Sequence, residues 1–425
     1  MDHTVPQPSG IQAATAEEDF KWVLPRFISL WEELVDIGLE SNGGYDRQTW
    51  TESHGALQSW FTTQATTRGM RVEGDGNGNL WAWLGEHQSG TAFATGSHFD
   101  SVPGGGGFDG PLGIVSAFAA IDLLTRRGKL PSFPLVVVNF AEEEGGRFGV
   151  PCLGSRLATG KIGPEAARKL QDRDGVSWEE AMREAGSDPG LMGPATAMLS
   201  RIGRFCELHI EQGIALAPLG QPVGVADAIW PHGRWRLQFQ GQGNHAGTTH
   251  MADRQDPVVA LGETILAVQS VAVEAEAVAT VGKIVPFPNA TNAVASSLAA
   301  WVDIRASQEA QLEGLLSIIS EAAESAANTA GVEFSCTMES RSAEVRFDTP
   351  FGEQIIEIGR EMGLEMPRLS TAAGHDAAVL AETIPSTMLF VRNQTGISHS
   401  PEEFAENSDC AIGVLVLASV LSAPA

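Results

Sequence analysis

Cysteine is scarce in this sequence of 425 residues. The four cysteines are far apart, and none of them forms a CxxC pair. Such spacing argues against a disulfide framework and against a structural zinc knot of thiolates. We therefore expect reduced thiols in a cytoplasmic protein, at Cys152, Cys206, Cys336 and Cys410.

Positive charge and long apolar runs are also in short supply. The chain has 27 Lys and Arg against 53 Asp and Glu, which gives a formal net charge of −26. This balance argues against nucleic acid and anionic membrane surfaces as partners. No apolar run approaches the length of a membrane span, and the N-terminus MDHTVPQPSGIQAAT lacks the basic and apolar regions of a secretory signal. We expect a small-molecule substrate, with no nucleic acid and no membrane as partner.

The chain is too long for one ordinary core, so we expect two domains. The nearly all-apolar run FPLVVVNFA at 133–141 is typical of a strand that is covered on both faces in a parallel or mixed α/β sheet. After Gly213 the pattern becomes strand-rich, with two long helical patterns among the strands. We predict a mixed-sheet, three-layer α/β/α catalytic domain from residues 1–219 and 341–425, with an inserted α+β sandwich at 220–340.

The stretch GSHFDSVPGGGGFDGPLG, at 96–113, lies between a predicted strand and a predicted helix. His98 and Asp100 share a face if the strand continues, because side chains alternate with a period of two. The glycines let the backbone fold back, which would bring Asp109 towards His98. A His and an Asp brought together at the end of a strand indicate the first half of a metal site.

Four further clusters carry residues that suit chemistry. Glu142, Glu143 and Glu144 come directly after the FPLVVVNFA strand, at the strand end where ligand sites of open α/β sheets lie. A lone EEE run is as readily a solvated acidic loop. The other clusters are LHIEQG with His209 and Gln212, GNHAGTTHMADRQDP with Asn244, His245, His250 and Arg254, and GISHSPEE with His399.

Three histidines at predicted strand ends indicate a site for metal ions. A lone His is more often packed in a core or exposed, but His98, His209 and His399 occur together with Asp109 and Glu144. His, Asp and Glu ligands without thiolates suit Zn, Mn, Co or Ni. Five ligands are too many for one four-coordinate ion with an open position, and they fit two ions that share a bridging carboxylate. A bridging hydroxide would be the nucleophile, and a carboxylate not bound to metal would be the general base.

Seven motifs succeed one another along almost the whole chain, namely HFDSVPGGGGFDG, EEEGGRFG, LHIEQG, GNHAGTT, PNATN, GHDA and GISHSPEE. Together they resemble the amidase/carbamoylase branch of the zinc exopeptidase-like clan. That branch includes N-carbamoyl-L-amino-acid amidohydrolases, beta-ureidopropionases and allantoate amidohydrolases. The resemblance implies a di-metal catalytic domain interrupted by a lid domain that also makes a homodimer.

The resemblance also implies which residues would be the ligands of two divalent metal ions per subunit. His98 and His209 would hold one ion, and Glu144 and His399 would hold the other. Asp109 would bridge the two ions.

Further roles are implied for residues around the ions. Glu143 would be the general base and then the acid that protonates the leaving amine, and Asp100 would orient His98. His245 would stabilise the oxyanion, either from the partner subunit or after lid closure. The substrate would be bound by Gln212, Asn292 and Arg305.

We therefore predict a cytoplasmic, homodimeric di-metal amidohydrolase that cleaves the ureido C–N bond of N-carbamoyl-L-amino acids or allantoate and releases ammonia and carbon dioxide. Two alternatives stay open. The same fold could act on an ordinary amide, as an aminoacylase or dipeptidase. The chain could also be a binding module that cradles an anion on the backbone of Gly104–Gly107, although this run lacks the Lys-Ser/Thr of a P-loop. The stretch IWPHGRW, with His232 and Arg234, has no place in the resemblance.

Overall fold

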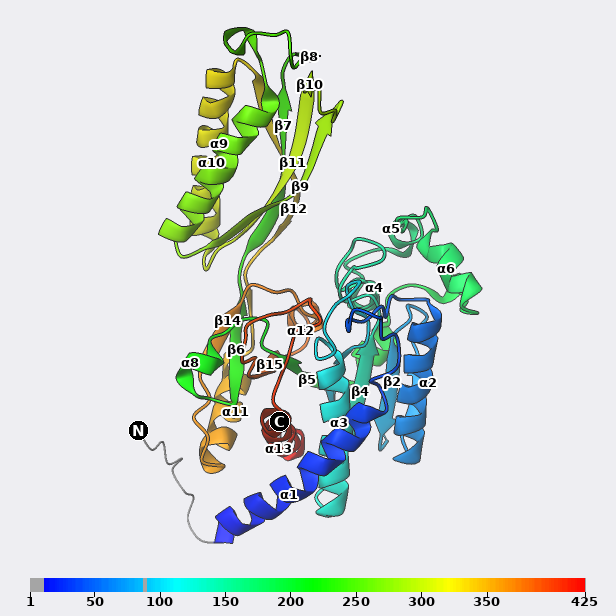
Figure 1. Ribbon diagram of the computed structural model, residues 1–425. Helices are drawn as coiled ribbons and strands as arrows, with labels where there is room; N and C mark the ends of the chain where they lie inside the picture. The colour runs from blue at the N-terminus through cyan, green and yellow to red at the C-terminus, as the bar shows by residue number, and fades with distance from the viewer. Residues whose placement is uncertain (1–10, 87–89, 425) are drawn as a thin grey trace. The chain divides into compact units, whose positions relative to one another are not determined.

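The chain forms two compact units in a computed structural model that describes residues 11–86 and 90–424 (Figure 1). The first unit contains the residues up to Asp227 and from Arg346 onward, and the second unit is Ala228–Val345. The prediction about a secretory signal concerns the first residues of the chain, and residues 1–10 lie outside the described part.

A nine-stranded mixed sheet organises the first unit. The central strands β4, β3, β5 and β15 run parallel, whereas β1, β2 and β6 pair antiparallel with their neighbours. The strand order is β1 (Arg71–Gly74), β2 (Leu80–Leu84), β4 (Leu135–Phe140), β3 (Ala92–His98), β5 (Ile202–Ile210), β15 (Ser386–Val391), β6 (Val223–Ile229) and β13 (Val345–Arg346), and β14 (Arg368–Thr371) pairs with β6.

Helices cover this sheet because its central strands are apolar on both faces. Every residue of β3, β4 and β15 is buried. The largest apolar cluster joins the sheet to α1 (Ile11–Glu32), α2 (Glu52–Thr67), α3 (Pro111–Arg126), α11 (Thr349–Glu361) and α13 (Asn407–Ser422). The first helix begins at Ile11.

Shorter helices complete the first unit. The helix α12 (Asp376–Ala381) contacts β5, β15 and α4 (Leu153–Thr159). A smaller apolar cluster around Trp178 holds the segment from 164 to 199. That segment contains α5 (Pro164–Ala167), α6 (Trp178–Glu184), η1 (Pro189–Leu191) and α7 (Thr196–Leu199), and α8 (Leu216–Leu219) comes after β5.

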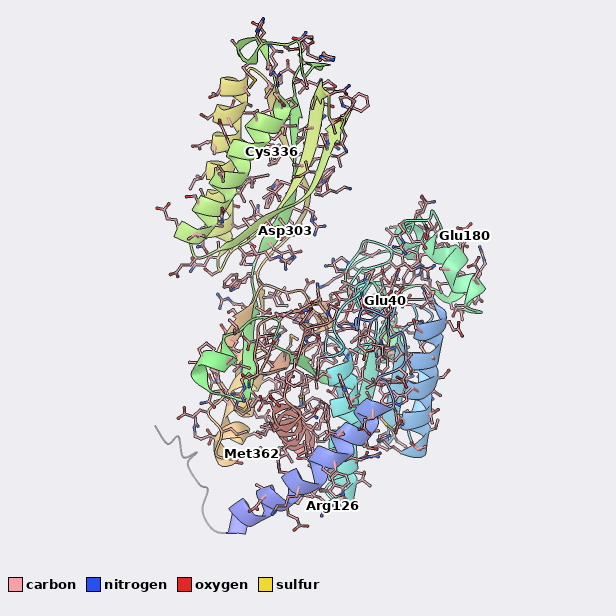
Figure 2. All side chains as sticks on the ribbon, in the orientation of Figure 1. Glu40, Arg126, Glu180, Asp303, Cys336 and Met362 are labelled. Carbon is pink, nitrogen blue, oxygen red and sulfur yellow. The ribbon has the colours of Figure 1, made fainter. Side chains whose placement is uncertain are left out.

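The second unit is a four-stranded antiparallel sheet with two long helices on one face (Figure 1). Burial alternates along its central strands because successive side chains point to opposite faces. One face packs on the helices, and Cys336, labelled in Figure 2, borders that core. The strand order is β12 (Glu333–Ser342), β7 (His232–Gln240), β11 (Ser297–Arg305) and β9 (Val278–Phe287), and the helices are α9 (Pro257–Glu274) and α10 (Glu309–Ala330). A small pair, β8 (Asn244–His245) and β10 (Ala293–Val294), lies at one end, with η2 (Met251–Asp253) after β8.

The boundaries of the interruption differ from the predicted range of 220–340. The structure divides the chain at 227/228 and 345/346. The reason is that β6 pairs with β15 and so extends the large sheet, although its sequence is as strand-rich as that of the second unit.

One described helix, α9, is long and apolar enough to cross a membrane by length and composition. The prediction that no apolar run reaches this length was therefore wrong. Length and composition do not distinguish a membrane span from a helix that packs on a sheet. In the second unit Ala260, Leu261 and Val268 of α9 are buried in the apolar core.

The four cysteines are free, and all except Cys336 are buried. This agrees with the predicted absence of a disulfide framework.

Candidate metal centre

The parallel strands bring their carboxyl ends to one edge of the large sheet, and the five predicted ligands lie there. His98 is the last residue of β3, and His209 is the last but one of β5. Glu144 lies beyond the end of β4, His399 lies beyond the end of β15, and Asp109 lies two residues before the start of α3.

Asp109 lies at the centre of this group. Its Oδ1 atom is 3.6 Å from His98 Nε2 and 3.2 Å from His209 Nε2. Its Oδ2 atom is 3.3 Å from His399 Nε2, which in turn is 3.2 Å from Glu144 Oε2. The structure thus brings together five side chains that are up to 301 residues apart in the sequence.

The tautomers of two histidines are set by backbone carbonyl groups. His98 Nδ1 lies 2.9 Å from the carbonyl oxygen of Asp100, and His209 Nδ1 lies 2.9 Å from that of Ile210. If each Nδ1–H donates to its carbonyl, the lone pair of each Nε2 faces Asp109. Both Nε2 atoms are buried, and neither has a hydrogen-bond partner. A buried polar atom without a partner is costly, and ligation of a cation would satisfy both.

The donor set therefore fits two divalent ions. Ligand atoms of His98, Asp109 and His209 lie within 4.8 Å of one another, and so do those of Asp109, Glu144 and His399. The two groups share Asp109, which is the arrangement expected of a bridging carboxylate. Imidazole and carboxylate donors without thiolates suit borderline divalent metals.

The charges of the centre are strongly coupled. Burial alone would raise the pKa of Asp109, but the imidazoles of His209, His399 and His98 lower it well below its usual value. Burial opposes a charged imidazole, yet the carboxylates of Glu143 and Asp100 raise the pKa of His98 well above its usual value. A dense set of facing carboxylates and imidazoles in a buried pocket is suited to holding cations.

The three consecutive glutamates take three different positions. Glu142 accepts hydrogen bonds from the backbone N–H groups of Arg147 at 3.0 Å and Phe148 at 2.7 Å, and thereby fixes the loop after it. Glu143 points into the centre, with Oε2 3.7 Å from His98 Nε2. Glu144 faces His399. The alternative of a solvated acidic loop does not fit these positions, because Glu142 and Glu143 are buried.

Glu143 has the surroundings of a proton acceptor. Burial raises its pKa well above the usual value, and the carboxylates of Asp376 and Glu144 add to this effect while His98 opposes it. The Cys152 thiol donates to Glu143 Oε1 at 3.3 Å and leaves Oε2 facing the centre. A carboxylate whose pKa is raised suits a group that both accepts and donates a proton.

The backbone is strained around the centre. Glu142, Cys152 and His399 have φ angles of 56°, 54° and 56°, in the left-handed region that non-glycine residues rarely adopt. Gly110 has a φ of 86°, and a Cβ there would lie 2.5 Å from the His98 imidazole, so only glycine fits.

Sequence reasoning missed several supporting residues. Glu403 accepts from the N–H groups of Phe108 at 3.0 Å and Asp109 at 2.9 Å, and from Ser398 Oγ at 3.0 Å. It thus holds the loop that carries the central carboxylate. Its only signal in the sequence is its place in the motif GISHSPEE, in which the predicted ligand is the histidine.

His375 was also missed as an individual residue. Its ring lies 4.5 Å from that of His209, and its Nε2 atom is buried without a hydrogen-bond partner. Burial and the neighbouring His209 lower the pKa of His375 well below its usual value, so it is neutral. The motif GHDA contained this signal.

Two further predicted residues, Asp100 and Gln212, contact the ligand side chains directly. Asp100 contacts His98 Nδ1 through its backbone carbonyl, whereas its carboxylate accepts from the N–H groups of Glu143 at 3.1 Å and Glu144 at 3.0 Å. Gln212 donates to Asp109 Oδ2 at 2.7 Å. It therefore lies at the centre itself, which is where a residue that binds the substrate would also have to lie.

The remaining predicted residues belong to the second unit. His245 and Asn292 are neighbours, because His245 pairs with Ala293 and the N–H of Ala246 donates to the Asn292 carbonyl. Arg305 lies at the opposite end of β11, where it donates to Asp303 Oδ1 at 2.9 Å. Their roles towards a substrate stay predictions.

Comparison with known proteins agrees with this geometry. The sequence profile of peptidase family M20/M25/M40 matches residues 94–423. An N-carbamoyl-L-amino acid amidohydrolase of Geobacillus stearothermophilus is 32% identical over 397 residues, which cover 91% of this chain and 96% of the relative. An allantoate amidohydrolase of Bacillus subtilis is 32% identical over 393 residues, which cover 92% of this chain and 95% of the relative.

A solved structure extends the likeness to the fold. The crystal structure of AtUAH in complex with (S)-hydroxyglycine has a TM-score of 0.81 at 30% identity, and the match covers 94% of this chain and 97% of that chain. The resemblance predicted from the seven motifs and the mixed α/β fold are thereby confirmed. The chain belongs to peptidase family M20/M25/M40 and is a metal-dependent hydrolase of amide C–N bonds.

Proposed function

We propose that the protein is a di-metal amidohydrolase that cleaves the ureido C–N bond of a small ureido acid, an N-carbamoyl-L-amino acid or allantoate. The observation that carries the proposal is the convergence of His98, Asp109, Glu144, His209 and His399, with a sixth side chain, Glu143, beside them. The relatives named above act on these two kinds of compound.

The five ligands would hold two divalent ions, chosen among Zn, Mn, Co and Ni, with His98 and His209 on one, Glu144 and His399 on the other, and Asp109 between them. Such ions, when bound, polarise a carbonyl oxygen and lower the pKa of water, which makes a nucleophile available at neutral pH.

Glu143 would accept the proton of the attacking water at its Oε2 atom, which faces the centre. It would then donate this proton to the leaving nitrogen, because its buried position favours the protonated form. The carbamate left after C–N cleavage releases carbon dioxide, so one water and one ureido group give ammonia, carbon dioxide and an amine.

The substrate's carboxylate is assigned to Arg305, whose planar guanidinium suits bidentate pairing. The oxyanion is assigned to His245, with Asn292 and Gln212 as further ligands of the substrate. Asp303 holds Arg305 at 2.9 Å and so restricts its orientation.

The dimensions of β11 support a homodimer. From Ser297 to Arg305 the strand spans about 26 Å at about 3.3 Å per residue. Asn292 and His245 lie beyond the Ser297 end (Figure 1). A ureido acid is roughly as long as two residues of extended chain, about 7 Å, so it cannot reach both ends. If both ends contact substrate, they do so in different active sites, and each site is completed by a partner subunit.

An apolar surface of the second unit supports the same proposal. Leu266 and Val273 of α9 are 67% and 74% exposed, and Val285 and Phe287 of the edge strand β9 are 49% and 66% exposed. The helix packs beside this strand. Exposed apolar side chains next to an unpaired strand edge are typical of a surface covered by another chain. We also propose a cytoplasmic location, which the four free cysteines support.

The proposed function is tested by loading the purified protein with Zn, Mn, Co or Ni and measuring ammonia release from allantoate and from N-carbamoyl-L-amino acids. N-acetyl amino acids and dipeptides, assayed for release of acid or amino acid, test the aminoacylase or dipeptidase alternative. We expect turnover of at least one ureido acid. Turnover of the acetyl compounds or dipeptides alone would contradict the ureido assignment.

The variant Glu143→Gln separates catalysis from ligation. Loss of a positioned general base lowers kcat by roughly 10²–10⁴-fold, while the metal content, measured by elemental analysis, stays at the wild-type level. The matched control is Glu142→Gln. Glu142 is the neighbour of Glu143 in the sequence, but its carboxylate faces the backbone of Arg147 and Phe148. Full activity of Glu143→Gln would end the assignment of Glu143.

A further inference from the structure

The loop that carries His245 is exposed, yet its backbone is held by many hydrogen bonds. Both residues of β8, Asn244 and His245, are exposed. The N–H of His245 donates to Asn244 Oδ1 at 2.9 Å. The carbonyl oxygen of His245 accepts from the N–H of Thr249 at 3.1 Å and from the hydroxyl group of Thr249 at 2.7 Å. Exposed loops are usually mobile, so these bonds indicate a loop that is built to hold one side chain in place.

The imidazole ring of His245 is held as well, and this contact determines its tautomer. The N–H of Gly247 donates to His245 Nδ1 at 3.1 Å. A backbone N–H is only a donor, so Nδ1 is the acceptor and the proton of the neutral ring is on Nε2. A Cβ at residue 247 would lie 3.3 Å from His245 Cε1. The close approach of ring and backbone therefore favours glycine at this position.

The Nε2–H group of His245 has no partner of its own. In the part of the chain that the structure describes, no residue forms a hydrogen bond or an ion pair with this atom, and the side chain is exposed. A neutral imidazole with its proton on Nε2 is a hydrogen-bond donor at that atom and cannot accept a proton there. The group is therefore suited to stabilising an oxygen atom that gains negative charge.

Arg254, in the stretch GNHAGTTHMADRQDP, has none of the roles assigned above. Its guanidinium group donates to the carbonyl oxygen of Ala246 at 2.6 Å and to that of Thr249 at 3.2 and 3.3 Å. No carboxylate among the described residues pairs with it. Its charge is thus used on two carbonyl groups that flank Gly247 in the sequence, the residue whose N–H binds the ring. Charge-assisted hydrogen bonds are stronger than neutral ones, so Arg254 is a main support of the loop.

We propose that Arg254 is a positioning residue, which holds this loop so that His245 presents a preorganised Nε2–H donor. The inference rests on the proposed function, in which His245 stabilises the oxyanion. It adds the tautomer of the ring and the residue that supports it, and it excludes His245 as a general base at Nε2. A donor that is fixed before the substrate arrives does not have to reorganise during the reaction, which makes it more effective than a mobile donor.

The tautomer is measured by NMR on the full-length protein, labelled with ¹⁵N-histidine, in the presence of Zn, which is diamagnetic, and without substrate. The resonances of His245 are assigned with the variant His245→Gln. We expect Nδ1 to resonate as an unprotonated nitrogen and Nε2 as a protonated one. In Arg254→Gln we expect the two tautomers to exchange, so that both resonances shift towards their average. If Arg254→Gln does not fold, Thr249→Val, which removes the hydroxyl bond to the His245 carbonyl, takes its place.

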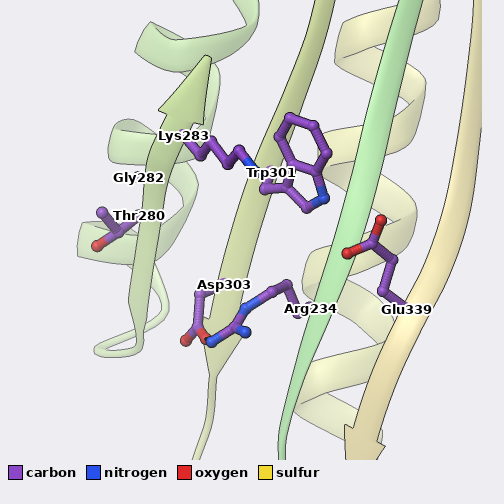
Figure 3. Close-up of a pocket in the computed structure, with 7 residues that line it drawn as sticks. All are labelled: Arg234, Thr280, Gly282, Lys283, Trp301, Asp303 and Glu339. Carbon is purple, nitrogen blue, oxygen red and sulfur yellow. The ribbon is translucent and has the colours of Figure 1, made fainter. Parts of the chain in front are cut away.

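The matched control for the spectrum is Arg234→Gln. Arg234 is an arginine of the same unit, but it pairs with Asp303 at 3.3 Å beside a hollow on the open face of the sheet (Figure 3). Its loss should leave the resonances of His245 unchanged. A proton on Nδ1 in the wild type, unchanged resonances in Arg254→Gln, or equal shifts in Arg254→Gln and Arg234→Gln would overturn the proposal. Because the spectrum needs no turnover, its outcome is separate from the test of the ureido activity.

Kinetics separate positioning from a general loss of structure. His245→Gln places an N–H group as many bonds from Cβ as the imidazole Nε2, whereas His245→Asn places one at the distance of Nδ1. We expect the kcat of His245→Gln to be about tenfold higher than that of His245→Asn. Because Arg254 acts through His245, the double variant Arg254→Gln/His245→Ala should have the kcat of His245→Ala, whereas independent effects would multiply. Equal losses in the Gln and Asn variants, or multiplied losses in the double variant, would also overturn the proposal.

Discussion

If His245 and Arg305 serve different active sites, two inactive variants should restore each other's activity. The distance between them within one subunit is set by β11, about 26 Å from Ser297 to Arg305. No contact inside one second unit can bring both to a substrate of about 7 Å. A shared site in a two-fold dimer can, because it takes one end from each subunit.

The perturbation is the pair His245→Ala and Arg305→Ala. Removal of an oxyanion donor costs roughly 10²–10³-fold in kcat, and removal of a charge-assisted carboxylate clamp costs roughly 10–100-fold in kcat/KM. Each homodimer is therefore nearly inactive. A heterodimer has one site that lacks both residues and one site that lacks neither. Its expected activity is about half that of the wild-type dimer, because one of two sites is intact.

The assay uses co-expression of the two variants with different affinity tags and purification over both columns in turn. Ureido hydrolysis is then compared with that of each homodimer. The matched control is the heterodimer of His245→Ala and Asn292→Ala. These two residues are neighbours in one subunit, so every site lacks one of them and no activity returns. Equal activities of the two heterodimers, or a protein that stays monomeric, would refute the reasoning.

Three further predictions concern the first unit. Cys152→Ala should lower kcat by about three- to tenfold, because one hydrogen bond to Glu143 contributes about 0.5–1.5 kcal/mol. Cys152→Ser should keep most of the rate, because its hydroxyl can still donate. Equal losses in both variants at unchanged metal content would contradict a positioning role. His54 is buried, and burial lowers its pKa from 6.5 to about 4. As the pH falls, the unfolded chain therefore takes up a proton at His54 at a higher pH than the folded chain does. Between pH 7 and pH 5 the free energy of unfolding, measured by urea denaturation, should fall by about 2 kcal/mol more in the wild type than in His54→Leu. Parallel pH profiles of the two proteins would count against this. Removal of metal by a chelator should lower Tm by several degrees, since a ligand at about 100 times its Kd contributes about 2.7 kcal/mol; His399→Ala should show a smaller difference between loaded and metal-free protein, and calorimetry that finds no difference in the wild type would argue against the site.

The convergence of the five side chains could be predicted from the sequence because most of them are tied to strand ends. His98 and His209 end strands whose residues are all or nearly all buried, and such strands are recognisable from their apolar runs. Once the strands are parallel, their carboxyl ends must meet at one edge of the sheet. The position of the glutamates after β4 is explained by the same rule.

The contacts that the sequence did not predict have no local pattern. Glu403 contacts the N–H groups of Phe108 and Asp109, nearly three hundred residues away, and a glutamate in an acidic run has no mark of this. Cys152 contacts Glu143 because the backbone turns sharply at Glu142 and again at Cys152.

The predicted range of the second unit, 220–340, differs from the observed one for a similar reason. Val223–Ile229 is a strand by composition in either unit, and only its pairing with β15 assigns it to the large sheet. The apolar character of α9 is likewise explained by its packing beside a sheet. This contact cannot be recognised from the composition of the helix. The domain roles of lid and dimer interface stay predictions.

The left-handed residues around the centre have a consequence for the evolution of heat resistance. Three of the six non-glycine residues with positive φ among residues 11–86 and 90–424 are Glu142, Cys152 and His399. Each such residue costs about 1 kcal/mol relative to glycine or asparagine at the same position. Glycine at His399 would remove a proposed metal ligand, and glycine at Glu142 would remove two hydrogen bonds to the loop. A selection for thermal survival alone would therefore favour glycine only at Cys152, where the gain in half-life at high temperature would be a loss of turnover. Heat-adapted relatives that remain active must gain their stability elsewhere in the chain.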